Sequence, residues 1–208
     1  MNYLTNSIDR VLFGDCPTLM QPLHGDPLPP PELSKHRFVC TQDGLYLEAH
    51  NAVIEVRQQI APSTIRLPYG KAGATGVMLK HGKIPQQILQ DALTEAAMAT
   101  PNEWAGLVVW NEPHSTYELF KPTILSTTPG HISYANHLPD GLVLVMDIHS
   151  HGNGEAFFSE TDNQSDLSGF YVAAVLGNCR HNNADAVTRM VVNGHFLACP
   201  SLPSFFCQ

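Results

Sequence analysis

Residues 142–166 read LVLVMDIHSHGNGEAFFSETDNQSD and join an apolar run to a dense group of polar side chains. The apolar start predicts a buried strand that ends in His149-Ser-His151. Alternation along a strand places residues two apart on one face, so the two imidazoles can converge on one ion. Loop 152–158 contains glycine and can fold back to bring Asp162 to the pair. Two nitrogens and one carboxylate oxygen suit a single Zn²⁺ ion and leave a fourth position for water.

Ser159 and Asp162 follow the two histidines at fixed offsets. The pattern H-S-H, seven residues, S, two residues, D resembles the signature of the JAB/JAMM (MPN-type) family of zinc metalloproteases. An H-x-H pair alone is weak evidence for a metal site in a chain with 11 histidines. The resemblance therefore rests mainly on the fixed offsets to Ser159 and Asp162. The family also places a glutamate upstream, where a helix meets a strand. Glu103, within PNEWAGL, holds the matching position.

The resemblance implies a hydrolase with one zinc ion held by His149, His151 and Asp162. It assigns Glu103 as the general base and later the general acid, and it makes Ser159 a donor to the oxyanion of the intermediate. Ser159 and Asp162 also match the S-x-x-D pattern of a helix-capping box, and both roles are compatible. The similarity covers about residues 84–200 and implies cleavage of a peptide or isopeptide bond.

Other residues compete for parts of this assignment. Glu103 is also explained as a solvated residue at a helix end. Three further glutamates are candidates for the base: Glu112, Glu118 and Glu155. Asp147 and Asp166 are candidates to orient the histidines from behind. The nine remaining histidines are interpreted as surface or structural residues, and the nearby aromatic residues as core or cavity wall.

Three positions depart from the family pattern, none of them a predicted ligand. Gly152 stands where many members have proline, Trp104 is bulkier than usual, and Trp110 replaces a frequent glycine. The whole chain is similar to one subgroup, the PRTRC system protein A family. That similarity rests on four short segments: GLYLEA, IAP, LPYG and AFFSETD. Neighbouring proteins in such systems resemble ubiquitin-activating enzymes and ubiquitin-like proteins, which implies a ubiquitin-like substrate or partner.

The sequence predicts an α/β (α+β) fold in residues 81–208, a JAB/MPN-like mixed sheet flanked by helices. A small β-rich module of unknown role is expected in residues 1–80. Its proline-rich start excludes a helix or central strand near residues 22–31, and residues 62–82 are expected to be connecting structure. The expected strands of this module lie between Arg37 and Ile60.

Local patterns place the elements of the larger domain. Residues 84–100 carry the apolar spacing of an amphipathic helix. Apolar residues from Leu167 to Val175 predict a second helix, closed by Gly177. Two hairpins are expected, the second around an Asn-Gly turn: residues 105–110 with 116–120, and residues 188–192 with 195–199.

Composition limits the classes of partner and compartment. The formal net charge of −8 argues against a general nucleic-acid-binding protein. The five cysteines form no C-x-x-C pair, so a disulfide framework is not expected. The N-terminal residues lack the basic start and apolar stretch of a secretory signal, and no apolar run is long enough to span a bilayer. We therefore expect a cytoplasmic protein. The resemblance to the JAB/JAMM family implies that it acts on a protein or peptide.

Two functions remain open at this point. One is a zinc peptidase or isopeptidase, and the other is a non-catalytic MPN-type scaffold that binds ubiquitin-like partners. A nucleobase deaminase would need H-x-E and P-C-x-x-C motifs, and the chain has neither. The zinc content of the purified protein would separate the two remaining functions.

Overall fold

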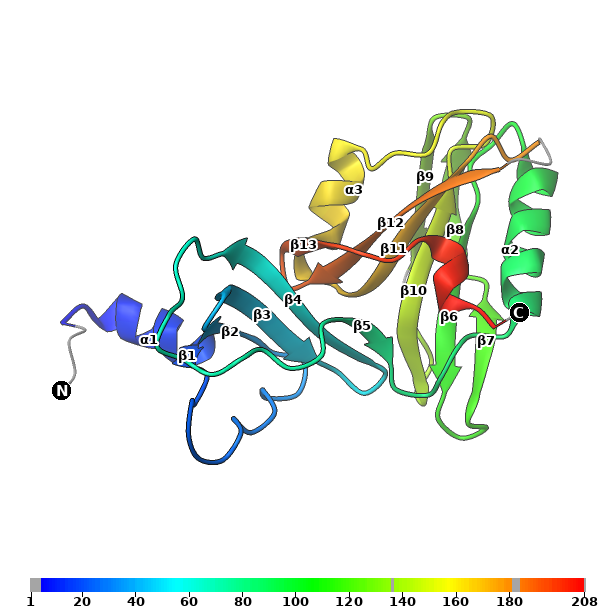
Figure 1. Ribbon diagram of the computed structural model, residues 1–208. Coiled ribbons are helices and arrows are strands. Elements are labelled where there is room, and N and C mark those ends of the chain that lie inside the picture. Colours follow the sequence, from blue (N-terminus) through cyan, green and yellow to red (C-terminus); the bar gives the residue numbers. More distant parts are fainter. Residues whose placement is uncertain (1–4, 136, 181–183, 208) are drawn as a thin grey trace. The chain divides into compact units, whose positions relative to one another are not determined.

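The computed structural model describes residues 5–135, 137–180 and 184–207 (Figure 1). The chain divides into two compact units, Met1–Lys80 and His81–Gln208. Each unit contains its own principal β-sheet. Across the described ranges, no helix is long and apolar enough to cross a membrane.

The N-terminal unit is a five-stranded sheet in the order β1-β2-β3-β4-β5. Only β1 and β2 run parallel; the other neighbours are antiparallel. Its elements are α1 (Ser7–Asp15), β1 (Thr18–Met20), β2 (His36–Thr41), β3 (Gly44–His50), β4 (Ile54–Pro62) and β5 (Gly76–Leu79). The strands expected between Arg37 and Ile60 are present. β5 corrects the expectation that residues 62–82 only connect, because its short edge pairing depends on β4 rather than on a strong local pattern.

The C-terminal unit is built on a six-stranded mixed sheet in the order β13-β12-β11-β10-β6-β7. Its helices are α2 (Gln86–Ala99), α3 (Glu160–Ser165) and the short 3₁₀ turns η1 (Asp166–Ser168) and η2 (Leu202–Phe205). Its strands are β6 (Ala105–Asn111), β7 (Thr116–Phe120), β8 (Thr123–Thr128), β9 (His131–Ala135), β10 (Leu142–Ser150), β11 (Phe170–Gly177), β12 (Asp185–Val192) and β13 (His195–Ala198). Figure 1 shows α2 and α3 on opposite sides of this sheet. The expected mixed α+β architecture with a sheet flanked by helices is confirmed.

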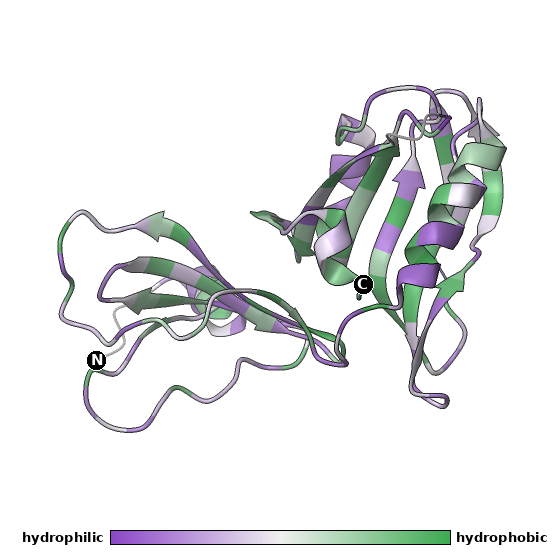
Figure 2. Cartoon of the chain, turned by 45° about the vertical axis from the view of Figure 1, so that its right-hand side comes forward, coloured by the Kyte–Doolittle hydropathy of each residue, from purple (hydrophilic) through white to green (hydrophobic). Residues whose placement is uncertain are grey.

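Helix α2 forms because its apolar residues recur at helical spacing. Ile88, Leu89, Ala92 and Ala96 are buried, and the helix packs against β6, β7 and β10. In Figure 2 the helix carries both hydrophilic and hydrophobic stretches, as an amphipathic helix does. Burial of a leucine or isoleucine side chain is worth about 1.5–3 kcal/mol, so this face anchors the helix to the sheet.

Strand β11 occupies the segment where a second helix was predicted, so that prediction is wrong. The strand lies between β10 and β12, and nearly all of its residues are buried. A short apolar run that is buried on both faces has no alternation, and periodicity alone does not separate it from a buried helix. The second helix is instead α3, which begins directly after Ser159.

Two hairpins flank the sheet in different ways. The predicted turn between β12 and β13 is confirmed: Asn193 and Gly194 have φ values of 46° and 86°, as a two-residue hairpin turn requires. The β8–β9 hairpin was not predicted, and it forms a separate two-stranded sheet. All of β8 is exposed, so no apolar alternation marks it in the sequence.

Candidate metal centre

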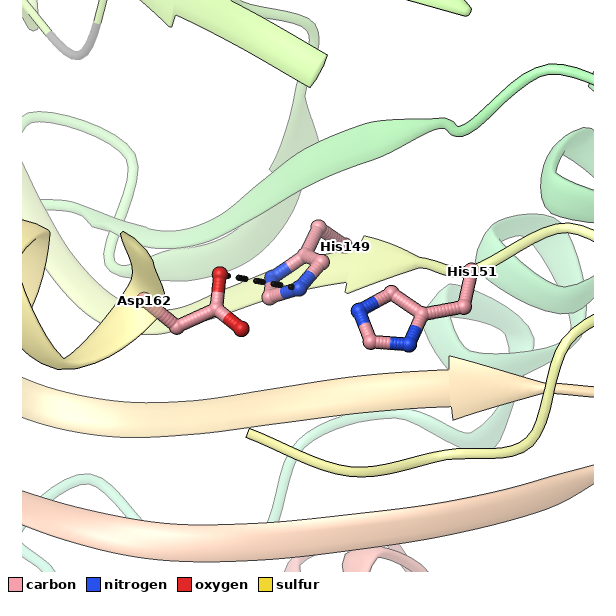
Figure 3. A group of neighbouring side chains, drawn as sticks. All are labelled: His149, His151 and Asp162. Atoms are coloured by element: carbon pink, nitrogen blue, oxygen red, sulfur yellow. Dashed lines mark ion pairs between the residues drawn. The ribbon is translucent and has the colours of Figure 1, made fainter. Parts of the chain in front are cut away.

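The three predicted ligands meet at the end of β10. Figure 3 shows His149 and His151 beside Asp162, which comes from α3. One ligand atom from each residue lies within 4.8 Å of the others. The strand places the two rings with their centroids 5.4 Å apart, because residues two apart share a face.

The ring of His149 is largely buried and has an unsatisfied nitrogen. Its Nε2 lies 3.4 Å from Asp162 Oδ1. This nitrogen is buried and has no hydrogen-bond partner among the described residues. Burial lowers the pKa of His149, which favours the neutral ring. A neutral imidazole offers a lone pair, so the orphaned nitrogen has the chemistry of a metal ligand.

The orientation of His151 is set by the loop that follows it. Its Nδ1 lies 3.1 Å from the backbone carbonyl of Glu155. A carbonyl only accepts, so Nδ1 carries the hydrogen in this contact and Nε2 remains available. The ring also meets the edge of Phe157, with centroids 4.6 Å apart. The Glu155 main chain therefore leaves Nε2 as the candidate ligand nitrogen of His151.

Asp162 is held by a capping box at the start of α3. Its Oδ2 accepts from the backbone N–H and the hydroxyl of Ser159, each at 2.7 Å, and its own N–H donates to Ser159 Oγ at 3.2 Å. These bonds occupy one carboxylate oxygen and leave Oδ1 facing His149. The capping pattern read from the sequence thus also orients the candidate ligand.

Glu103 lies beside the three candidate ligands because its main chain is fixed on two sides. Ser150 Oγ accepts from the N–H of the neighbouring Trp104 at 2.9 Å, which ties this segment to β10. The Glu103 N–H donates to Thr128 at 3.0 Å, and its carbonyl accepts from Thr127 at 2.7 Å. Burial raises the pKa of the Glu103 carboxyl, and this effect outweighs the lowering effect of His151.

A cavity of about 380 Å³ opens onto this group. Glu103, His151, Ser159 and Asp162 line it, together with Phe157 and residues 129–132 of the β8–β9 hairpin. The three competing glutamates, Glu112, Glu118 and Glu155, are not among its lining residues. Of the four candidate glutamates, Glu103 is therefore the one placed to act at the triad.

A second cavity, of about 240 Å³, is lined by His149 and Asp162. Asp147 lines it and accepts from the Tyr134 hydroxyl at 2.7 Å, and burial raises the pKa of Asp147 to about 7. Asp166 also lines it and pairs with Arg189 at 2.6 Å. Among the described contacts neither aspartate bonds to a histidine ring, so the expected orienting role is not seen for either.

Two residues at this centre were missed by the sequence analysis. Ser150, the serine between the histidines, is fully buried and ties the Glu103 segment to the ligand strand. His131 lines both cavities and acts electrostatically on Glu103, although it was grouped with the structural histidines. Nothing local marks His131, because the folding of the β8–β9 hairpin over the site brings it there.

The three departures from the family pattern have local explanations. Gly152 has φ +55°, whereas proline requires about −65°, so the loop after His151 takes a path that proline cannot follow. The Trp104 ring packs over Gly106, where a Cβ atom would lie 2.4 Å from it. Trp110 stacks on His81 with ring centroids 3.9 Å apart. None of the three positions is a member of the triad.

Comparison with known proteins places both parts of the chain. Residues 85–192 match the family described as prokaryotic homologs of the JAB domain. Residues 6–80 match a domain of unknown function (DUF2016). No curated protein matches this chain.

Several solved structures resemble the chain at low sequence identity. A solution structure of a Desulfitobacterium hafniense protein is 15% identical with a TM-score of 0.43, covering 60% of this chain and 98% of that one. The crystal structure of a JAB1/MPN domain protein from Archaeoglobus fulgidus is 17% identical with a TM-score of 0.37. The match covers 57% of this chain and 94% of that one. Because the family match spans more than half of its 208 residues, this protein belongs to the prokaryotic homologs of the JAB domain.

Proposed function

We propose that this protein is a zinc-dependent peptidase or isopeptidase of the JAMM type. The observation that carries the proposal is the meeting of His149, His151 and Asp162, whose ligand atoms lie within 4.8 Å of one another. The orphaned Nε2 of His149 supports it further, because a buried nitrogen without a partner is costly unless something binds there. Two imidazoles and a carboxylate are a ligand set that suits Zn²⁺ in catalytic sites.

Zinc, when bound, would supply a Lewis acid and a water molecule of lowered pKa. Glu103 lines the same cavity, and its carboxylate takes the proton of the attacking water. The raised pKa of the Glu103 carboxyl favours holding that proton until it passes to the leaving nitrogen. The C–N bond breaks, and the products are a carboxylate and an amine.

Ser159 has one hydroxyl hydrogen, and in this structure Asp162 accepts it. Its first role is therefore to position the Asp162 carboxylate. Donation to the oxyanion of the tetrahedral intermediate requires the hydroxyl to exchange this bond for one to the substrate. Both roles are part of the proposal, and they predict different effects of removing the hydroxyl.

The proposed substrate is a ubiquitin-like protein or another protein with an extended C-terminal tail. A cavity of about 380 Å³ admits a few residues of chain rather than a folded surface. The similarity to the PRTRC system protein A family supports a ubiquitin-like partner by analogy alone.

The first experiment measures zinc in protein purified without added metal or chelator. We expect about one zinc per chain in the wild type and none in Asp162→Ala. Glu103→Gln should keep its zinc and should no longer hydrolyse ubiquitin-like proteins encoded near its own gene. Hydrolysis is measured by mass spectrometry of the C-termini of these proteins. Glu112→Gln is the matched control, since Glu112 is exposed and does not line the cavity.

The alternative is a non-catalytic MPN-type scaffold that binds ubiquitin-like partners. Wild-type protein without zinc would refute the enzyme proposal and favour the scaffold. Zinc-loaded Glu103→Gln that still cleaves would refute the assignment of Glu103 as the base.

A further inference from the structure

Arg37, Glu48 and Arg57 form a row of charged side chains across three neighbouring strands of the N-terminal unit. Arg37 on β2 lies opposite Glu48 on β3, and Glu48 lies opposite Arg57 on β4. Arg37 Nε and Nη2 donate to one Glu48 oxygen at 2.9 Å and 2.7 Å, and Arg57 Nε donates to the other at 2.6 Å. Each carboxylate oxygen is thus satisfied by a different guanidinium.

The two guanidinium groups retain donors that this row does not use. Within the described chain, Arg37 Nη1 and both Nη atoms of Arg57 have no hydrogen-bond partner. The Arg37 side chain is only 6% exposed. Arg37 and Arg57 both line a cavity of about 330 Å³.

The walls of this cavity combine positive charge with an apolar surface. Lys80 lies on its lining and donates to the carbonyl of Asn51 and to His50 Nδ1. Leu28, Pro30 and Pro31 form an apolar wall. A ligand that fits has a polar head for the arginines and an apolar body for the prolines.

The charged residues that line the cavity indicate the charge of its ligand. Three cations, Arg37, Arg57 and Lys80, face two carboxylates, those of Glu48 and Glu55, so one positive charge remains. This local excess occurs on a chain whose formal net charge is −8. A monovalent carboxylate matches one positive charge and the paired N–H donors of a guanidinium, whereas a divalent phosphate would leave an excess negative charge.

We propose that the cavity bounded by Arg37, Arg57, Lys80 and the Pro30–Pro31 wall binds a carboxylate attached to an apolar group. The carboxylate accepts from the free Nη donors of the two arginines, and the apolar group packs on the prolines. Such a ligand is the C-terminal residue of a peptide or an acidic side chain with an apolar neighbour. This site is independent of the metal centre and does not rest on the proposed hydrolysis.

The test is a titration of the full-length, ¹⁵N-labelled chain followed by the arginine Nε–H signals. The probes are N-acetyl-L-leucine, its neutral amide, N-acetyl-L-glutamic acid α-amide and inorganic phosphate. We expect N-acetyl-L-leucine to saturate the Arg57 Nε–H shift with a Kd of about a millimolar, as ligands of this size allow. The neutral leucine amide and phosphate should cause no saturable shift.

Variants separate binding from folding. In the variants binding is followed by the Arg37 Nε–H signal, because Arg37 also lines the cavity. Arg57→Gln should weaken binding by at least about tenfold, which is the scale of losing a charge-assisted pair of bonds. Arg57→Lys keeps the charge but lacks the guanidinium fork, so its affinity should lie between those of the wild type and Arg57→Gln. Arg66→Gln removes an exposed arginine of the same unit outside the cavity and should bind like the wild type.

Each outcome decides between binding and no binding of a carboxylate. Saturation by N-acetyl-L-leucine supports a C-terminal carboxylate as the source, and equal saturation by the glutamate probe extends the source to acidic side chains. The proposal is overturned if the neutral amide binds as well as the acid, if phosphate binds as well as either carboxylate, or if no probe shifts the Arg57 signal. Unchanged binding in Arg57→Gln, with a native-like spectrum, also overturns it.

Discussion

Ser159→Ala separates the structural and chemical roles of the serine that caps α3. The substitution removes the hydroxyl that donates to Asp162 Oδ2 at 2.7 Å and accepts from the Asp162 N–H at 3.2 Å. The backbone N–H of Ser159 still donates to Asp162, so the carboxylate loses part of its support and not all of it. Asp162 is then free to rotate away from the two histidines.

Two magnitudes follow from these contacts. Loss of a serine N-cap costs about 1 kcal/mol of stability in the metal-free protein. Loss of a hydrogen bond that orients a metal ligand lowers metal affinity by about 10–100-fold, or about 1.4–2.7 kcal/mol. The larger effect should therefore appear in zinc affinity and the smaller one in unfolding.

Zinc affinity is measured by competition with a chromophoric chelator, and stability by urea unfolding of the metal-free protein. Ser159→Thr keeps a hydroxyl and should restore both quantities. Ser168→Ala is the control, because Ser168 is exposed and is not part of the capping box. Zinc affinity within about threefold of the wild type in Ser159→Ala would refute the positioning role; a loss of hydrolysis alone would then assign the hydroxyl to the oxyanion.

Three further predictions concern other parts of the fold. Glu48→Gln leaves the buried Arg37 without its carboxylate and should cost about 3–5 kcal/mol in urea unfolding, whereas Glu55→Gln should cost little, since Glu55 is exposed. Gly152→Ala should destabilise the protein by about 1–3 kcal/mol, because the position has φ +55° and a Cβ would lie 2.7 Å from the Pro101 carbonyl oxygen; a calorimetric scan that matches the wild type would contradict this. Burial raises the pKa of the Cys199 thiol to about 12 from an ordinary 9.0. The contribution of the protonated thiol to the free energy of unfolding is therefore complete below pH 9.0 and is lost as the pH rises toward 12. Cys199→Ser should flatten that alkaline loss in unfolding experiments, and the exposed Cys207 should react with Ellman's reagent before Cys199 in the native protein.

Features that depend on short, regular spacing could be predicted from the sequence. Alternation on β10 was sufficient to place His149 and His151 on one face, and the S-x-x-D pattern predicted the cap that begins α3. Helix α2 and the Asn193-Gly194 turn were likewise predicted, because their apolar period and backbone conformation are local properties. The offsets from the histidines to Asp162 predicted the meeting of the triad, because one loop joins them.

The meeting of segments that are distant in the chain depends on the tertiary fold. β11 is a strand because β10 and β12 cover it, and a buried apolar run carries no period that would reveal this. Glu103 reaches the triad through the Ser150–Trp104 contact, and His131 reaches it through the β8–β9 hairpin. The row formed by Arg37, Glu48 and Arg57 exists only in the register of β2, β3 and β4. Pairing between strands depends on contacts between residues far apart in the chain, so local patterns could predict the ligands of the candidate centre but not its complete surroundings.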